Sequence, residues 1–449
     1  MKFYLALWAS KFYLFISKIF GQSKSDKAGL LAAKICPEVL SKVNKPKNVI
    51  LVTGTNGKTT VTHLIYNILK NDGKKIGFNI WNANTRAGHI RCLIDSVNIF
   101  NKPNKDYAIL ECDELTSDTT IPEIKPNYII VTNICRDSIR RNSYPEFIFS
   151  RINEGVTKSK DSVLILNADD PISSFLGKDN KKIFVSIDKL NNDEVYENIS
   201  PDFVVCPNCN SKVKYEYKHY RHIGKFKCPS CKLESFKGDY RVTSINDNSF
   251  TLNGIEYPKL SSNLFNIFNE SEVIVLLKEL GYDFKFIQES LKKSSIPKSR
   301  ENLEVEKGIK IYSQMAKGQN SSALSTVLEN LSKLDNKKQI ILLLDEVYDN
   351  PYSAETITWI YDSDFELLNK LNLEKIIITG PRYLDYIVRL KLAGVPEDKI
   401  EVSRDYKEAY KLLNLDKKSD IYVLYEVERR PMSREVVESI KERIDLEVK

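Results

Sequence analysis

The sequence predicts an α/β protein: a P-loop parallel-sheet domain with a zinc-ribbon insertion, followed by a Rossmann-like C-terminal α/β domain. Three observations support this fold class. A Gly-rich loop joins an apolar run to a helical pattern near Gly54, and two C-x-x-C pairs lie near the middle of the chain. Apolar runs also alternate with helical stretches on both sides of those pairs. Such alternation is typical of parallel sheets that helices cover on both faces.

Length and composition describe an ordinary globular protein. The chain has 449 residues, 42% of them hydrophobic and 28% charged, and this length corresponds to about three domains. The formal net charge of +7 is spread without a dense basic block, which argues against a nucleic acid partner and fits anionic substrates. Because the cysteines form no secreted disulfide pattern, we expect a cytoplasmic protein. Four isolated cysteines are expected to fill the core: Cys36, Cys92, Cys112 and Cys135.

The N-terminal segment, residues 1–47, begins with the apolar run MKFYLALWASKFYLFISKIFG. Lys11 and Lys18 interrupt this run, so it is too charged for a membrane-spanning helix. Ser10 and Ser17 lie beside the lysines, which predicts a helix with one polar stripe and a broad aromatic surface. Two interpretations stay open: a helix docked on the core, or a helix that touches a membrane or a partner.

The first α/β domain is predicted to span 48–302. It opens with a strand, the Gly-rich loop and a helix whose apolar residues share one face and which is expected to end at Gly73. Between 200 and 245 cysteine, lysine and tyrosine become more frequent, and KVKYEYKHY suggests a hairpin within an inserted zinc ribbon. Another helix, LFNIFNESEVIVLLKELGYD, follows. Further strands are expected at 106–112, 127–134 and 161–171.

The C-terminal domain is predicted to span 303–449, with the boundary near the stretch KSRENLEV. Apolar runs again alternate with helical stretches there, which predicts a second parallel sheet. Its strands are expected at 339–346, 375–380 and 420–426.

The loop GTNGKTT, Gly54–Thr60, resembles a phosphate-binding loop but departs from the common spacing, because Val52 stands where that pattern needs its first glycine. Glycines let backbone N–H groups turn toward phosphate oxygens, and the helix N-terminus adds partial positive charge. Lys58 is placed to reach the β- and γ-phosphates, and the Thr59 hydroxyl to bind Mg²⁺. The structural alternative, a Gly-rich turn before a helix, does not explain the Gly-Lys-Thr-Thr run.

This variant spacing resembles the Mur ligase family, and further stretches in the family's order support the resemblance. These are LECDE with Glu111, TNICRD at 132–137, NADDP at 167–171, FNIFN at 265–269 and Ser299–Arg300. The family forms amide bonds: ATP phosphorylates a carboxylate, and an amine attacks the acyl phosphate. Such chemistry needs a phosphate clamp, a metal ion and cations around the tetrahedral intermediate.

The resemblance implies a set of site residues. Lys58, Glu111 and Arg300 are the expected catalytic residues, and Thr59 and Glu111 the expected Mg²⁺ ligands. The expected ATP-binding residues are Gly54, Thr55, Asn56, Gly57, Lys58, Thr59, Thr60, Asn266, Asn269 and Arg300. The implied cofactors are ATP, Mg²⁺ and a structural Zn²⁺.

The pairs CPNC and CPSC predict the zinc site, with 18 residues between them. Two thiolates on a tight turn bind one metal ion, and a second such turn completes a tetrahedron. Disulfides are the alternative, which a cytoplasmic setting disfavours. His219 and His222 lie between the pairs and are not needed as ligands. The expected zinc ligands are Cys206, Cys209, Cys228 and Cys231.

Within the Mur family, a four-cysteine insertion resembles the MurT-like subgroup, which includes ligase subunits of glutamine-dependent lipid II isoglutaminyl synthases and is similar to archaeal pseudomurein peptide ligases. The C-terminal stretches TWIYDSDFELLNK and ITGPRYLDYIVRLKLAGV agree with this. The resemblance implies a cell-wall peptide precursor, linked to a nucleotide or a lipid, as substrate and a glutaminase subunit as an alternative partner.

One departure from the subgroup concerns the source of the amine. Thr356 stands where the subgroup carries an aspartate that serves the partner's Cys-His pair, and MAKGQNSS at 315–322 also differs. Asp349 and Asp362 are the aspartates that would replace it. The leading interpretation is therefore an amino acid ligase, and the alternative is the ammonia-using subunit. A third interpretation is a nucleotide-regulated zinc-ribbon binding protein.

Overall fold

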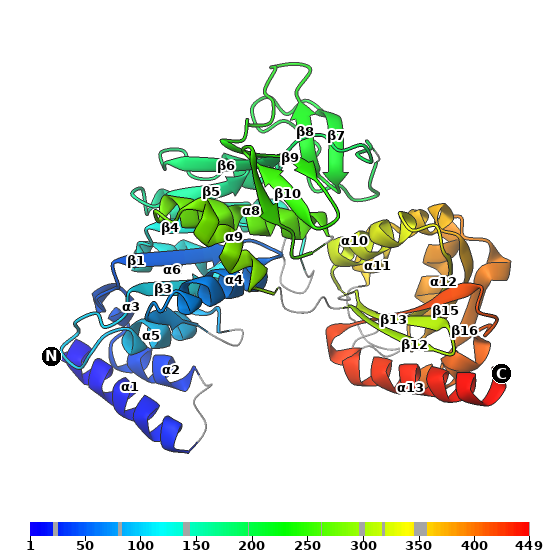
Figure 1. Ribbon diagram of the computed structural model, residues 1–449, viewed down its shortest axis with the longest axis horizontal. Coiled ribbons are helices and arrows are strands. Elements are labelled where there is room, and N and C mark those ends of the chain that lie inside the picture. The colour runs from blue at the N-terminus through cyan, green and yellow to red at the C-terminus, as the bar shows by residue number, and fades with distance from the viewer. Residues whose placement is uncertain are drawn as a thin grey trace. The chain divides into compact units, whose positions relative to one another are not determined.

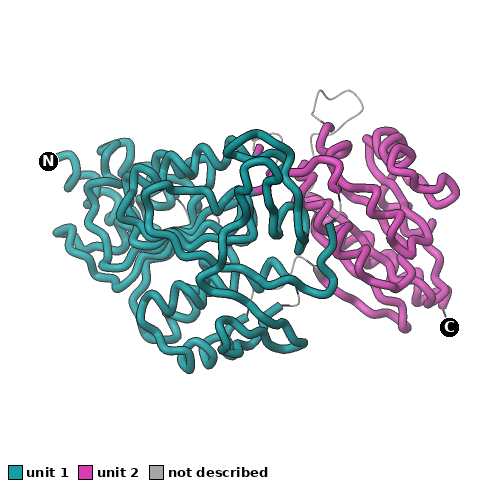
Figure 2. Tube along the Cα trace, turned by 90° about the horizontal axis from the view of Figure 1, so that it is seen from above, with its two compact units in different colours: residues 1–134, 145–196, 203–297 teal, residues 135–144, 197–202, 298–449 magenta. Residues whose placement is uncertain are grey.

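The computed structural model describes residues 1–20, 26–79, 83–137, 144–195, 197–261, 263–295, 301–316, 319–344 and 357–448. The chain divides into two compact units (Figure 2). Unit 1 comprises residues 1–134, 145–196 and 203–297, and unit 2 comprises residues 135–144, 197–202 and 298–449. Each unit is built around its own main sheet with helices on it, which confirms the predicted α/β fold class.

The main sheet of unit 1 has nine strands in the order β11-β10-β9-β6-β5-β4-β1-β3-β2. In this order, all neighbouring strands between β9 and β2 pair parallel. Strands β10 and β11 extend the sheet beyond β9 as an antiparallel edge. The bounds are β1 Asn48–Thr53, β2 Ile76–Phe78, β3 Tyr107–Glu111, β4 Tyr128–Val131, β5 Val163–Asn167, β6 Lys182–Ile187, β9 Tyr240–Ile245, β10 Ser249–Leu252 and β11 Ile255–Pro258.

Helices cover both faces of this sheet (Figure 1), so its central strands are apolar on both sides. Along β1 the side chains alternate: Val49 and Leu51 enter the core on one face, and Ile50 and Val52 enter the core on the other. The second face is covered by α4 Lys58–Asn71, α8 Leu264–Glu279 and α9 Phe284–Lys292. The first face is covered by α5 Arg86–Asp95, α6 Ser117–Ile124 and α7 Pro145–Thr157.

The strand order places the Gly-rich loop at a switch point. After β1 the chain adds β2 and β3 on one side of it, and then β4, β5 and β6 on the other side. Neighbouring connections therefore diverge at the carboxyl end of β1, and in open α/β sheets ligands bind in the crevice at such a point. The loop that follows Thr53 opens there.

The N-terminal helices are α1 Lys2–Ile19, α2 Lys27–Ile35 and α3 Val39–Lys42. Helix α1 packs on α2 and α5, and its buried side chains include Ser10 and Ser17. The two serines of the expected polar stripe therefore face the protein, while Lys18 and much of the aromatic surface are exposed. No helix in the described part of the chain is both long and apolar enough to cross a membrane.

The predicted hairpin in the cysteine-rich segment is present. Strands β7 Lys214–Tyr220 and β8 Ile223–Lys227 pair antiparallel and form a sheet of their own. The last residues of the 200–245 segment instead form β9, which pairs with β6 of the main sheet.

The sheet of unit 2 has six strands in the order β12-β13-β17-β14-β15-β16, all parallel except β12. One face carries α10 Ser321–Ser332, α11 Thr358–Asp362 and α12 Tyr383–Leu392, and the other carries α13 Arg430–Glu447. The strand bounds are β12 Glu301–Glu306, β13 Ile309–Met315, β14 Lys337–Leu343, β15 Leu373–Thr379, β16 Ile400–Ser403 and β17 Ser419–Tyr425.

Two short segments from earlier in the chain belong to unit 2. Arg136 Nη1 lies 3.1 Å from Asp362 Oδ2, and Asn320 Nδ2 donates to Asp137 Oδ1 at 2.6 Å. The backbone N–H of Ile199 donates to Asp364 Oδ1 at 2.7 Å. These polar contacts hold both segments on unit 2.

Candidate active site and metal site

The loop between β1 and α4 requires glycine at two positions. Gly54 and Gly57 have φ of 118° and 93°, in the region that favours glycine. A Cβ at Gly54 would lie 2.5 Å from Thr132 Oγ1, and a Cβ at Gly57 would lie 2.6 Å from Asn269 Oδ1. Other side chains are excluded at both positions, so the loop backbone keeps its tight path.

The segment after β4 holds the Gly-rich loop in place through hydrogen bonds. Thr132 Oγ1 donates to the carbonyl of Asn56 at 2.6 Å, and the N–H of Thr55 donates to the carbonyl of Asn133 at 2.8 Å. The Asn133 amide also bonds both the N–H and the carbonyl of Asn56, at 3.2 and 3.0 Å. These hydrogen bonds from residues 132–133 fix the conformation of the loop. Thr132 and Asn133 lie in the TNICRD motif but were not among the site residues predicted from the sequence.

Lys58 begins α4 with its ammonium group inside the loop. Its Nζ donates to the carbonyls of Gly54 and Thr55 and lies 2.8 Å from Glu114 Oε2. Burial lowers the pKa of Lys58, but the Glu114 carboxylate outweighs burial and holds that pKa above its usual value. Lys58 is therefore a cation. Glu114 is fully buried and was not among the site residues predicted from the sequence, although it stands three residues after Glu111 in the same motif.

Glu111 ends β3, the neighbour of β1, and its backbone is held on two sides. Asn79 donates to the Glu111 carbonyl at 2.7 Å and accepts from its N–H at 2.8 Å. His89 Nε2 lies 2.7 Å from the same carbonyl. Burial lowers the pKa of His89 to about 4, so the ring is neutral and its Nε2–H donates to the carbonyl. Asn79 and His89 position Glu111, and the sequence offered no signal for either.

The two asparagines on α8 lie at the same loop. Asn269 sits against Gly57, and its Nδ2 donates to Asn266 Oδ1 at 3.3 Å. Asn266 Nδ2 in turn donates to Ser261 Oγ at 2.9 Å. The structure therefore places Asn269 against the loop and Asn266 next to Asn269, and their nucleotide-binding role stays a prediction. Arg300 lies outside the described residues.

The residues present fit a magnesium-bound nucleoside triphosphate. No side chain caps the N-terminus of α4, and its first turn carries no acidic residue. The helix dipole and first-turn N–H groups therefore favour an anion. Thr59 is exposed in this turn, and the Glu111 carboxylate ends the adjacent strand, so the two supply oxygen ligands of the kind Mg²⁺ prefers.

Two aspartates of the NADDP motif connect the main sheet with the β7–β8 hairpin. His219 Nδ1 lies 2.9 Å from Asp193 Oδ2, and His219 Nε2 lies 3.6 Å from Asp169 Oδ2. His222 Nε2 lies 3.5 Å from Asp170 Oδ1. Both histidines therefore face carboxylates of unit 1. Neither belongs to the cluster of four cysteines that could hold a metal ion, as the sequence indicated.

We expect the His219 ion pair to make stability depend on pH. Burial alone would lower the pKa of His219, but Asp169 and Asp193 raise it from 6.5 to about 9. The raised pKa contributes about 3 kcal/mol of stability below pH 6.5, and this contribution is lost as pH rises through about 9. Denaturant titrations at several pH values should show this fall, and His219→Gln should lack it. An equal slope in the variant would contradict the assignment.

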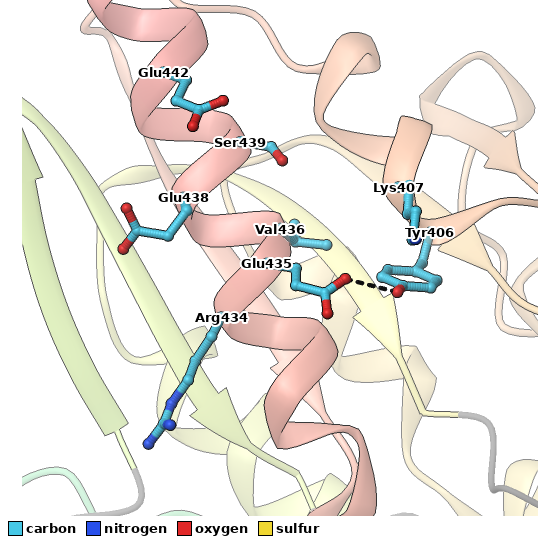
Figure 3. A pocket seen from close by; sticks show the side chains of 8 residues that line it. All are labelled: Tyr406, Lys407, Arg434, Glu435, Val436, Glu438, Ser439 and Glu442. Carbon is cyan, nitrogen blue, oxygen red and sulfur yellow. Dashed lines mark hydrogen bonds between the residues drawn. The ribbon is translucent and has the colours of Figure 1, made fainter.

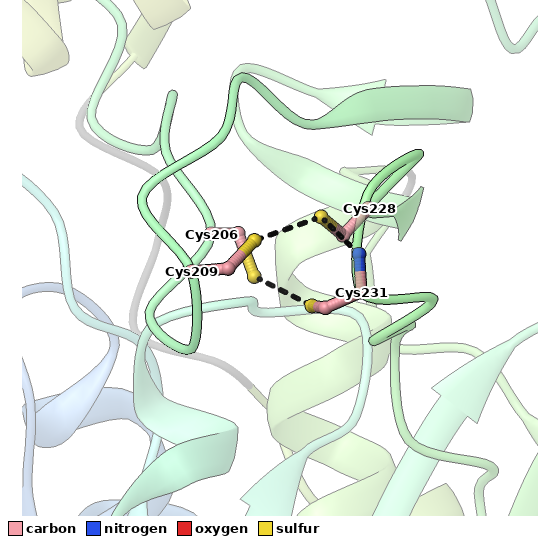
Figure 4. Close-up of side chains that lie close together, drawn as sticks. All are labelled: Cys206, Cys209, Cys228 and Cys231. Carbon is pink, nitrogen blue, oxygen red and sulfur yellow. Dashed lines mark hydrogen bonds between the residues drawn. The ribbon is translucent and has the colours of Figure 1, made fainter.

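The four expected metal ligands form one cluster (Figure 4). Their Sγ atoms all lie within 4.8 Å of one another, with Cys206–Cys231 at 3.5 Å and Cys209–Cys228 at 3.4 Å. These distances exclude disulfides and suit a tetrahedral zinc ion, whose sulfur ligands are separated by about 3.8 Å. Hydrogen bonds from Ser211 lower the pKa of Cys209 to about 6, whereas burial raises the pKa of Cys206 to about 11. The other four cysteines are buried, as predicted.

A surface hollow on unit 2 holds none of the sequence-predicted site residues (Figure 3). It lies between α13 and the 3-10 helix Tyr406–Leu412, where the Tyr406 hydroxyl donates to Glu435 Oε2 at 2.8 Å. Its charged side chains have mixed sign, with Lys407 and Arg434 opposed by three glutamates. It therefore offers no selective anion or cation site.

Comparison with known proteins matches both units to one family. Residues 52–220 match the Mur ligase middle domain, and residues 318–427 match the MurT ligase C-terminal domain. The chain belongs to the Mur ligase family. It is accordingly an ATP-dependent amide ligase, and the interpretation as a nucleotide-regulated binding protein is set aside.

Curated relatives align with nearly the whole ligase. It is 29% identical over 419 residues to the lipid II isoglutaminyl synthase (glutamine-hydrolyzing) subunit MurT of Staphylococcus aureus (strain N315), covering 92% of this chain and 93% of that one. The subunit of the same name from Streptococcus pneumoniae (strain ATCC BAA-255 / R6) is 25% identical over 429 residues, covering 94% of each chain.

Solved structures of family members share the fold. A pseudomurein peptide ligase type C from Methanothermus fervidus superposes with a TM-score of 0.68 at 21% identity, covering 94% of this chain and 86% of that one. MurF from Acinetobacter baumannii superposes with a TM-score of 0.63 at 16% identity, covering 92% of this chain and 80% of that one. At these identities the likeness establishes the fold of the ligase.

Proposed function

We propose that this ligase is the ATP-dependent subunit of a glutamine-dependent amidotransferase, and that it converts a carboxylate of a lipid-linked cell-wall peptide into an isoglutaminyl amide. The observation that carries the proposal is the alignment with MurT subunits over 92% of the chain. This finding favours the alternative drawn from the sequence over the leading interpretation, in which an amino acid supplies the amine. The implied partner is a glutaminase that releases ammonia.

The site residues suit an acyl phosphate pathway. The substrate carboxylate attacks the γ-phosphorus of ATP and ADP leaves; ammonia then attacks the acyl carbon, and phosphate leaves with the electron pair of the broken C–O bond. Lys58 and the N-terminus of α4 stabilise charge on the transferring phosphoryl group. Thr59 and Glu111 would hold Mg²⁺, which neutralises phosphate charge. Asn269, which lies against Gly57, and its hydrogen-bond partner Asn266 would contact the nucleotide.

The amino acid ligase remains the second candidate because of Thr356, which has no carboxylate to orient a partner's histidine. Thr356 and Asp349 lie outside the described residues. Asp362, the other aspartate considered as a replacement, lies 3.1 Å from Arg136 within unit 2. That ion pair occupies its carboxylate, so Asp362 is poorly suited to serve a partner's histidine.

A nitrogen-source assay tests the proposal. The purified ligase is incubated with ATP, Mg²⁺ and lipid II, and with ammonium, glutamine, glutamine plus a co-purified glutaminase, or single amino acids. We expect ammonium, and glutamine with the glutaminase, to yield the carboxamide detected by mass spectrometry. Product with an amino acid but not with ammonium would overturn the proposal and assign the second candidate.

Reaction compartment and partners follow from the same proposal. A ligase that uses ATP and binds zinc through thiolates suits a cytoplasmic location. The expected macromolecular partner is a protein that supplies ammonia, and no nucleic acid partner is proposed, because the positive charge is small and dispersed.

A further inference from the structure

Helix α1 presents an apolar face to the exterior of unit 1. Phe12 and Phe15 are 66% and 62% exposed, and Leu5, Trp8, Ile16 and Ile19 are exposed beside them. These side chains share one face at helical spacing. The helix lies at the outer edge of the unit, with α2 and α5 on one side of it (Figure 1). A group of large apolar side chains exposed together on one face of a helix indicates an interaction surface.

The orientation of α1 is fixed by polar contacts on its other side. Ser10 Oγ donates to the Ala28 carbonyl at 2.7 Å, and Lys11 Nζ donates to the carbonyls of Ile94 and Val97. These groups would lose their partners if the helix turned its aromatic face inward, and each buried polar group left unpaired is costly. The apolar face is therefore held outward.

The exposed face continues beyond α1. Trp8 Nε1 donates to the Ile99 carbonyl at 2.9 Å, and the exposed side chains of Ile99 and Phe100 extend the patch from a neighbouring turn. Leu30 of α2 is exposed as well. Aromatic rings with one polar edge, such as Trp8, are enriched where apolar and aqueous regions meet.

Lysines flank the apolar face. Helix α1 carries Lys2, Lys11 and Lys18 and no acidic residue. Projected on a helix, the exposed Lys2 lies at one border of the apolar face and the exposed Lys18 at the other, while the ammonium of Lys11 is directed to backbone carbonyls of the protein. Of the acidic groups nearby, Glu38 pairs with Lys42, and Asp95 of α5 lies close to Lys11 and lines a hollow with Lys18. A helix with apolar centre and basic borders matches the boundary of an anionic lipid layer.

We propose that α1 is an interfacial membrane helix, which seats the ligase on anionic lipid with its apolar face in the acyl–headgroup boundary. Charge complementarity and the fixed outward aromatic face favour a lipid surface over a protein partner. The inference goes beyond the proposed function and does not depend on the nitrogen source. Lys18 and Arg91 also line a small hollow beside Asn79, the residue that holds Glu111, so the seated face lies next to active-site supports.

Vesicle binding tests the proposal with the full-length protein and no substrate. We expect sedimentation with phosphatidylglycerol–phosphatidylcholine vesicles, and much weaker sedimentation with phosphatidylcholine alone or at high salt. Phe12→Glu/Phe15→Glu should lower the partition coefficient about tenfold or more, because two apolar rings leave the lipid. Lys2→Glu/Lys18→Glu should remove the preference for anionic vesicles.

A matched control is Phe284→Glu, because Phe284 is an exposed phenylalanine in unit 1, 44% exposed at the start of α9. It should bind vesicles like the unsubstituted chain, and thermal unfolding should show that all variants are folded. Equal vesicle binding by the Phe12/Phe15 variant would overturn the proposal. The proposal would also be overturned if the unsubstituted chain bound no vesicles but self-associated, and the Phe12/Phe15 variant did not self-associate. That result would assign the face to a second copy of the chain.

Discussion

Replacing Lys58 with methionine is expected to abolish ATP-dependent product formation. The Lys58 ammonium lies inside the loop and keeps its charge through Glu114. Methionine fills similar space but cannot stabilise the negative charge that develops on the transferring phosphoryl group. We expect kcat to fall by about 10²–10³-fold or more, as when one preorganised donor is removed from a transition state. ADP release in the presence of lipid II and ammonium measures this.

The ion pair with Glu114 means that the single variant also changes stability. Glu114 is fully buried, and a buried carboxylate that loses its cation costs about 3–5 kcal/mol. The double variant Lys58→Met/Glu114→Gln should therefore recover stability in denaturant titrations without recovering activity. Activity in the double variant would show that Lys58 serves folding alone and would end its assignment as a catalytic residue.

Loss of one zinc ligand is expected to unfold the segment 206–231, which contains the four cysteines and the β7–β8 hairpin between them. Structural zinc sites contribute on the order of 10 kcal/mol to the folding of small domains. Cys228→Ser should lower the zinc content from one ion per chain and should expose the segment between Cys206 and Cys231 to proteases. Because β7 and β8 form a separate sheet, nucleotide affinity should change much less than protease resistance.

A buried cysteine elsewhere gives the control for this experiment. Cys92→Ala, on α5, removes a thiol that lies outside the cluster and should leave the zinc content unchanged. Elemental analysis is the primary measurement, and limited proteolysis followed by mass spectrometry locates the exposed segment. A chain that contains no zinc but forms disulfides between these cysteines would contradict the assignment.

Local sequence patterns predicted the features that depend on neighbouring residues. The strand–loop–helix around Lys58 and the cysteine pairs each carry their chemistry within a short stretch, so their spacing was sufficient. Asn79, His89 and Asn133 could not be found this way, because they meet Glu111 and the loop only after distant strands pair. Nothing in the immediate sequence of Asn79 or His89 distinguishes them from other polar residues, whereas Asn133 lies in the TNICRD stretch, which gave no site role to this residue.

The N-terminal helix shows the same limit for surfaces. Its pattern correctly separated a polar stripe from an aromatic one, but the usual rule places the apolar side inward. In the structure the inward side carries small and aliphatic residues such as Leu7, and the aromatic side stays exposed because α2 and α5 offer Ser10 and Lys11 backbone carbonyls as partners. Those acceptors exist only once the other helices have formed, so periodicity alone could not assign the two sides.

The segment after β4 has a consequence for how the protein can be dissected. Thr132 and Asn133 hold the phosphate-binding loop, and only three residues later Arg136 is tied to Asp362 of unit 2. A gene fragment beginning at residue 298 would omit Arg136, Asp137 and Asn198. The buried carboxylate of Asp364 would then lose Asn198 as its hydrogen-bond donor. Neither unit is a contiguous cassette. Exchange of unit 2 of this chain would therefore have to include segments 135–144 and 197–202 together with the C-terminal half.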